Sequence, residues 1–193
     1  MLKPRRIIPW EYPFTADEAN NANDRWGCNC GPTALAAMLG LKPDNVFPHI
    51  PKFAERRYTN PSMMQAALRS LGVDYMEVDD TEDREEELNG RTDLRWPKYG
   101  LMRIQWEGPW LNPGVPVAAA YRHTHWVGVV CIEKGDPLFG RFPGRWLFDC
   151  NCGWSGPNQW VESVVKPITS EIKRATGGWH PTHRWELQLP HHA

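Results

Sequence analysis

The chain has 193 residues, 41% of them hydrophobic and 23% charged, so it is long enough for one domain with a substantial core. Its formal net charge of -1 at pH 7 gives no electrostatic reason to expect binding to nucleic acid or to a membrane surface. Prolines interrupt the basic N-terminus and no apolar run follows, so we expect no signal peptide, no transmembrane span and a cytoplasmic location. Five cysteines, an odd number, fit a reducing compartment.

Helices are predicted only in the first half of the chain. Residues 1–27, rich in Pro, Asn and aromatic residues, predict an extended arm. A short apolar helix follows from Cys30 to Leu39, with a proline in its first turn and a glycine after its end. Residues 43–58 predict a loop, and a second helix begins after Asn60, which suits the N-cap position, and ends before Gly72.

The remainder of the chain predicts strands. Alternating or Val-rich segments indicate strands at residues 73–78, 101–106, 117–121, 126–132, 145–149 and 184–189. The acidic run at 79–87 is typical of a solvated loop or exposed helix, although it could also attract a basic peptide. We expect one α+β domain over residues 1–193, with residues 167–193 as a C-terminal extension.

A cysteine, a histidine and an acid occur in an order that suggests nucleophilic catalysis. Cys30 stands at a helix N-terminus, where the helix dipole lowers the pKa of a thiol. His125 begins a Val-rich strand, and an imidazolium beside the thiol would lower that pKa further. Either residue could instead have a purely structural role, as a buried thiol or a hydrogen-bonded histidine. The alternative base is His123, two positions away.

The histidine needs an acceptor that orients its ring. Asp149 and Asn151 share one face of a strand, while Cys150 and Cys152 share the other. Both Asp149 and Asn151 are chemically suitable, and we favour Asp149 because it ends the apolar run. Asp149 could also be an ordinary turn residue.

Taken in chain order, four segments resemble papain-like cysteine peptidases, nearest the branch that cleaves double-glycine leader peptides from bacteriocins. The segments are Cys30–Leu39, Gly114–Val117, His125–Val129 and Phe148–Asp149, within roughly residues 24–152. The resemblance implies a papain-like fold and a Cys-His-Asp triad that hydrolyses a peptide or protein substrate through an acyl-enzyme. It implies no cofactor and no metal. Acyl transfer to an amine is a related outcome.

The chain departs from this family before the nucleophile. The family uses a Gln there to help hold the oxyanion, but no Gln precedes Cys30. Asp24 would oppose an oxyanion, whereas Asn23 and Asn29 carry amides, and we assign the role provisionally to Asn23. If neither amide serves, the chain is an inactive, peptide-binding module.

A third hypothesis is a zinc-stabilised domain. Two Cys-x-Cys pairs could supply four thiolates, from Cys28, Cys30, Cys150 and Cys152. Their spacing is shorter than is usual for paired zinc ligands. Binding of zinc by Cys30 would also remove the nucleophile.

Overall fold

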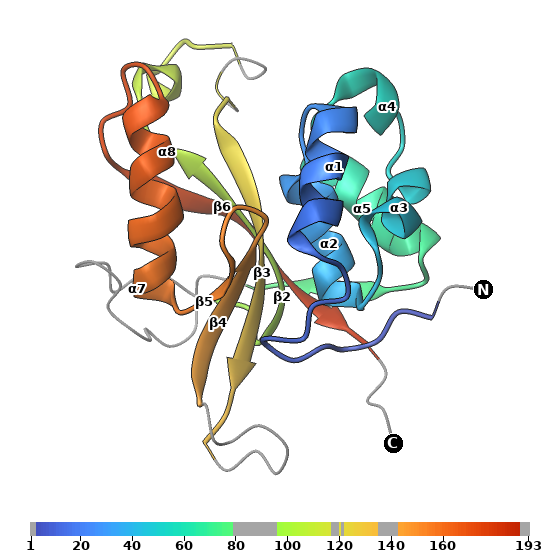
Figure 1. Cartoon of the computed structure of the whole chain (residues 1–193). Helices are drawn as coiled ribbons and strands as arrows, with labels where there is room; N and C mark the ends of the chain where they lie inside the picture. Colours follow the sequence, from blue (N-terminus) through green and yellow to red (C-terminus); the bar gives the residue numbers. More distant parts are fainter. Residues whose placement is uncertain (1–2, 79–95, 117–119, 121, 135–142, 190–193) are drawn as a thin grey trace.

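The computed structural model describes residues 3–78, 96–116, 120, 122–134 and 143–189. This part of the chain is α+β, as predicted: a helical lobe packs on one face of an antiparallel sheet, and a further helix covers the other face (Figure 1). No helix within it is both long and apolar enough to cross a membrane. The acidic run at 79–87 and all but residue 120 of the strand expected at 117–121 lie outside the described residues.

The helical lobe contains the first half of the described chain. It consists of α1 (Ala16–Trp26), α2 (Cys30–Leu39), α3 (Pro43–Val46), the 3-10 turn η1 (Phe47–His49), α4 (Phe53–Arg56) and α5 (Pro61–Ser70). The predictions of α2 and α5 are confirmed. The prediction of a loop over residues 43–58 is wrong in part, because three short helical turns occupy it.

The extended arm expected over residues 1–27 is also wrong, because α1 occupies its second half. The Thr15 side chain accepts a hydrogen bond from the Glu18 N–H (3.1 Å), and the Glu18 carboxylate accepts one from the Thr15 N–H (2.7 Å). This capping box satisfies two backbone donors that a helix start leaves free. At the other end Trp26 is buried and stacks on Phe47 with ring centroids 4.6 Å apart, which holds α1 against the lobe.

Six strands form one antiparallel sheet in the described part of the chain. They are β1 (Asp74–Glu77), β2 (Tyr99–Trp106), β3 (Thr124–Ile132), β4 (Gly144–Asp149), β5 (Gly153–Ser155) and β6 (Trp179–Gln188). Their order across the sheet is β1-β6-β2-β3-β4-β5. The central pair, β2 and β3, therefore lies between β4, which is the next strand in the chain, and β6, which is the last strand of the described chain.

The residues expected to form a C-terminal extension, 167–193, instead contribute β6, an interior strand of the sheet. It pairs with β1 on one side and β2 on the other. Gly100 of β2 makes this pairing possible, because a Cβ at that position would lie 1.8 Å from the carbonyl oxygen of Trp185. A larger residue at this position would force the two backbones apart.

A helix that the sequence reading did not predict covers the second face of the sheet. It runs through α7 (Pro157–Trp160), the π-helical turn η3 (Val161–Val165) and α8 (Lys166–Glu171). The wider π turn ends two residues before Pro167, a residue that cannot donate a backbone hydrogen bond.

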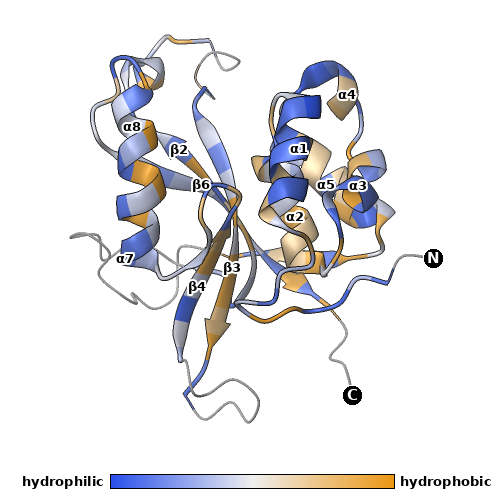
Figure 2. Cartoon of the chain, in the orientation of Figure 1, coloured by the Kyte–Doolittle hydropathy of each residue, from blue (hydrophilic) through white to orange (hydrophobic). Residues whose placement is uncertain are grey.

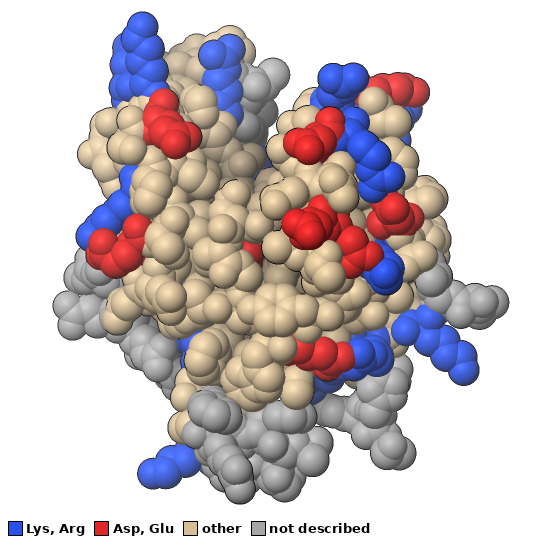
Figure 3. Space-filling view, viewed as in Figure 1, with Lys and Arg blue, Asp and Glu red and all other residues tan. Residues whose placement is uncertain are grey.

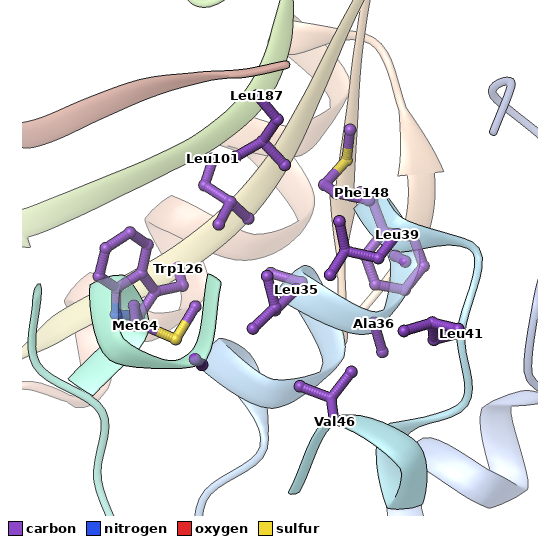
Figure 4. Close-up of a cluster of buried hydrophobic side chains, with 14 of the residues drawn as sticks. Leu35, Ala36, Leu39, Leu41, Val46, Met64, Leu101, Trp126, Phe148 and Leu187 are labelled. Atoms are coloured by element: carbon purple, nitrogen blue, oxygen red, sulfur yellow. The ribbon is translucent and has the colours of Figure 1, made fainter. Parts of the chain in front are cut away.

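Two hydrophobic clusters result, one on each face of the sheet. The larger fills the space between the helical lobe and the sheet, where Leu35 and Leu39 of α2 meet Leu101 and Trp126 (Figure 4). The smaller lies under α7 and α8 and includes Trp160. Figure 2 shows α1 with hydrophilic residues on its outer side and hydrophobic colour on the inner helix α2 and on β3. The sheet is thus a rigid layer to which both helical parts are fixed.

Candidate functional site

Cys30 is the first residue of α2 and is half-buried. The chain reaches it from α1 through Gly27, whose φ of 71° is in the left-handed region that glycine tolerates best. Gly31 follows, and a Cβ there would lie 2.1 Å from Thr59 Oγ1. A glycine after the cysteine therefore lets the first turn of α2 pack closely against the segment before α5. That contact fixes where the thiol lies.

His125 lies on β3, opposite Ile104 of β2, and its side chain is buried. Its Nε2 atom donates a hydrogen bond to Asp149 Oδ2 at 2.7 Å. The ring also meets the Trp106 ring, with centroids 6.1 Å apart. Because Nε2 is committed to the carboxylate, Nδ1 is the ring nitrogen left for the thiol.

Asp149 ends β4 and is 0% exposed, yet all its acceptor positions are used. Oδ2 accepts from His125 and also from Trp160 Nε1 (2.9 Å). Oδ1 accepts from the backbone N–H (2.9 Å) and the side-chain amide (3.0 Å) of Asn151. Asn151, the other candidate for the orienting acceptor, thus supports Asp149 rather than replacing it. Trp160 was not predicted, although a buried indole N–H requires an acceptor.

Electrostatic attraction between His125 and Asp149 favours the charged form of each residue. Burial acts to lower the pKa of His125, but Asp149 and the Cys30 thiol outweigh it and raise that pKa well above its usual value. Burial acts to raise the pKa of Asp149, but His125 and the donors from Asn151 and Trp160 lower it overall. The contact with the Asp149 carboxylate and the nearby Cys30 sulfur thus favours the imidazolium form of His125.

The Cys30 thiol differs from the sequence-based expectation. Its pKa is raised, because it donates a hydrogen bond to the Cys28 sulfur and because it is buried, and the attraction of His125 offsets this only in part. The pKa of Cys28 is lowered, since its sulfur accepts from the Cys30 thiol and from the Cys30 backbone N–H. Cys28 therefore opposes ionisation of the Cys30 thiol, and His125 favours it. The sequence reading considered Cys28 only as a zinc ligand.

The remaining candidate residues lie apart from this group. His123 has a φ of 54° and packs on Trp110, with ring centroids 4.7 Å apart, and partial burial lowers its pKa. Asn23 is exposed on α1, and in the described part of the chain its side chain makes no hydrogen bond to Cys30 or His125. Asn29 points its amide away, donating to the Ala19 carbonyl (2.9 Å). Neither amide is placed as an oxyanion donor.

The four-cysteine zinc set is not assembled. Cys152 is exposed and lies beside Ser155, with Sγ and Oγ 3.6 Å apart. In the described residues the one group that brings three ligand atoms within 4.8 Å of one another is His125, Asp149 and Cys150. A metal there would have to break the His125–Asp149 hydrogen bond and the others that Asp149 accepts. The donor set fits a hydrogen-bonded catalytic pair better than a metal.

A cavity of about 520 Å³ lies beside the start of β3. Gln105, which pairs with the residue before His125, lines it together with Trp110, and so do His180 and His183 of β6. Figure 3 shows the surface hollowed between the helical lobe and the lobe of α7 and α8, with charged side chains mostly around the rims. The turn between β4 and β5, directly after Asp149, lies between these two lobes in Figure 1.

No family model, curated protein or solved structure matches the chain. Function is therefore inferred from the geometry of the site and from the motifs in the sequence.

Proposed function

We propose that the chain is a thiol hydrolase with a papain-like fold, a cysteine peptidase or isopeptidase that acts through Cys30, His125 and Asp149. The observation that carries the proposal is the buried His125–Asp149 hydrogen bond of 2.7 Å, formed beside a cysteine at a helix N-terminus. A nucleophile, a base and a residue that orients the base are the parts that such catalysis requires. The related branch that cleaves double-glycine leaders has the same order of residues.

The first step is attack of the Cys30 sulfur on the carbonyl carbon of the substrate. Nδ1 of His125 takes the thiol proton as the new carbon–sulfur bond forms, which leaves an imidazolium beside the acyl group. The backbone N–H groups of Cys30 and Gly31 at the start of α2 would donate to the oxyanion, because a helix start leaves its first N–H groups without intrahelical partners.

In the next step the imidazolium of His125 gives its proton to the leaving amine, and the carbon–nitrogen bond breaks. Neutral His125 then takes a proton from water, which attacks the thioester carbon. The carbon–sulfur bond breaks, the acid is released, and His125 returns the proton to the Cys30 sulfur. Asp149 holds the ring through both steps and stays ionised, because its charge is stabilised by four hydrogen bonds.

The experiment that tests the proposal is alkylation at pH 6 with limiting iodoacetamide, mapped by peptide mass spectrometry. It is done in a Cys28→Ala background, so that Cys30 is the only thiol of the pair. A thiol with a pKa of about 8.5 is only about 0.3% thiolate at this pH. We expect fast labelling of Cys30, slow labelling of the exposed Cys152, and loss of the fast reaction when His125→Ala is added. Cys30 labelling as slow as that of Cys152 contradicts the proposal.

A second candidate function is a peptide-binding module without turnover. The observation that favours it is the position of Asn23 and Asn29, neither of which supplies the oxyanion donor that the family takes from Gln. Loss of one such donor costs about 10²–10³ in rate in a comparable site. Fast labelling of Cys30 together with no cleavage of a fluorogenic peptide library would favour this function over hydrolysis.

A further inference from the structure

Arg57 is an exposed cation that the helical lobe does not neutralise. It follows α4, and in the described part of the chain its guanidinium makes no ion pair and no hydrogen bond. Two other arginines of the lobe have partners there. Arg25 pairs with Asp44 (2.5 Å), and Arg56 donates to the Tyr58 hydroxyl (2.7 Å). The charge of Arg57 is therefore available to a ligand.

Two close contacts place Arg57 beside the start of α2. Its Cδ atom lies 3.7 Å from the position that a Cβ on Gly27 would take, and Thr59 Oγ1 lies 2.1 Å from the corresponding position on Gly31. The two segments therefore run side by side, and Cys30 lies in the chain between the two glycines. The charge of Arg57 thus stands at the edge of the candidate site.

The backbone of Arg57 has a conformation that favours glycine. Its φ is 55°, in the left-handed region, and its N–H donates to the Phe53 carbonyl oxygen (2.8 Å) at the end of α4. The segment that follows is fixed, because Thr59 is buried and its carbonyl oxygen accepts from the Trp126 indole N–H (3.4 Å). Strained residues persist where the surrounding structure fixes them, and they cluster at binding sites. An arginine where glycine would be less strained indicates a role for its charge.

The carboxylates that are nearest in the chain do not cancel this charge. Glu55 of α4 forms no ion pair with Arg57 in the described structure. Asp24, at the end of α1, lines a depression between α1 and α3 together with Lys42. Neither Arg57 nor Cys30 contributes to that depression. The positive charge beside the site is therefore not balanced from α1 or α4.

Arg122 adds a second positive charge near the strand that carries the base. It is exposed and directly precedes His123, whose pKa is lowered both by burial and by the Arg122 charge. His125 lies two residues further along the chain. Figure 3 shows Lys and Arg side chains at the top of both lobes, on either side of the hollow between them. A ligand in this hollow meets positive charge from both lobes.

We propose that Arg57 is a specificity-determining residue whose guanidinium binds a carboxylate of the substrate, so that the substrate is an acidic peptide. A guanidinium offers parallel N–H donors that match the two oxygens of a carboxylate. At physiological ionic strength the field of an exposed charge reaches about 8 Å, so the acidic side chain lies within a few residues of the cleaved bond. The identity of the substrate rests on the proposed function, but the positive field at Cys30 does not.

The test compares the anionic reagent iodoacetate with the neutral reagent iodoacetamide at Cys30 of the full chain carrying Cys28→Ala. Both reagents react with the thiolate, so the ratio of their rates reports the local field and not the thiol pKa. At about 10 mM ionic strength the screening length is about 30 Å, and we expect Arg57→Gln to lower the ratio several-fold. Salt at about 1 M should remove the difference between the two chains.

Two further variants control for folding and for net charge. Arg57→Gly suits the positive φ, so it should lower the ratio as much as Arg57→Gln does, without a fall in Tm. Lys98→Gln removes an exposed charge at the other end of β2 from His125 and should leave the ratio unchanged. A ratio that neither Arg57 variant lowers overturns the proposal.

Protection by peptides separates this proposal from the proposed function. Hexapeptide mixtures that carry Glu are compared with the same mixtures carrying Gln for protection of Cys30 against iodoacetamide. We expect stronger protection by the Glu mixtures, and equal protection by both once Arg57→Gln is added. Stronger protection by the Glu mixtures with no peptide cleaved by the unmodified chain would refute the thiol hydrolase alone. Equal protection before Arg57 is changed overturns the acidic specificity, whether or not peptides are cleaved.

Discussion

Replacing Asp149 with asparagine tests the centre of the site with the smallest change of shape. Oδ2 now accepts from His125 and Trp160, and Oδ1 accepts twice from Asn151. An amide has one oxygen and one NH2 group, so in either orientation two of these four donors face a donor. The variant also leaves His125 without its counter-charge in a buried position.

The expected loss of stability follows from these contacts. Removing one partner of a buried ion pair costs about 3–5 kcal/mol, and each hydrogen bond to a charged group accounts for about 1.5–3 kcal/mol. Because the four bonds share one carboxylate, their energies are not additive, and we expect about 3–5 kcal/mol in total. For a chain of this size that corresponds to a fall of roughly 6–20 °C in Tm.

Urea unfolding measures this, with the midpoint falling while the m value stays the same. Asp24→Asn, an exposed carboxylate on α1, is the matched control and should stay within about 0.5 kcal/mol of the wild type. A ring titration by NMR should show the pKa of His125 falling, because burial then acts without the opposing charge. A variant as stable as the control, with an unchanged His125 pKa, would refute the reasoning.

Three further predictions concern the surroundings of this pair. Trp160→Phe keeps the ring but removes the N–H that donates to Asp149, so urea unfolding should show a loss of about 1.5–3 kcal/mol; a loss under 0.5 kcal/mol contradicts it. The raised pKa of His125 adds stability below about pH 6.5, and this stability is lost as pH rises through the folded pKa. The lowered pKa of Asp149 adds stability above about pH 4, and this stability is lost as pH falls through the folded pKa. Unfolding across pH should therefore show a maximum between about pH 4 and 6.5 that is weaker in Asp149→Asn, and an equally strong maximum in that variant argues against the linkage. Gly100→Ala should destabilise by several kcal/mol or prevent folding, since its Cβ would meet a backbone carbonyl of β6 at 1.8 Å, whereas Gly156→Ala, in open space, should change Tm little.

Local signals explain which helices were predictable. Asn60 accepts a hydrogen bond from the Met63 N–H (2.9 Å), as its N-cap position indicates, so α5 was predicted from a few neighbouring residues. The same type of signal at Thr15 and Glu18 was present but outweighed by the Pro- and Asn-rich composition around it. Composition describes an average over a segment, whereas a cap is a contact between two specific residues.

Contacts between distant segments explain what was not predictable. The position of β6 between β1 and β2 depends on pairings across most of the chain, and no local pattern encodes them. For the site, strand alternation does not apply to Asn151, because β4 ends at Asp149 and Asn151 reaches the Asp149 carboxylate from the turn that follows. The raised pKa of Cys30 results from the neighbouring Cys28 and from burial, which spacing alone does not reveal.

Because β6 lies in the middle of the sheet, the sheet is completed late in synthesis. The segments that carry Cys30, His125 and Asp149 all leave the ribosome before β6. Yet β2, which supports His125 through Ile104 and Trp106, has β6 as its second neighbour, and β1 joins the sheet only through β6. A growing chain therefore carries the thiol without the completed sheet behind it. The sheet behind Cys30, His125 and Asp149 is therefore complete only after β6 has been synthesised.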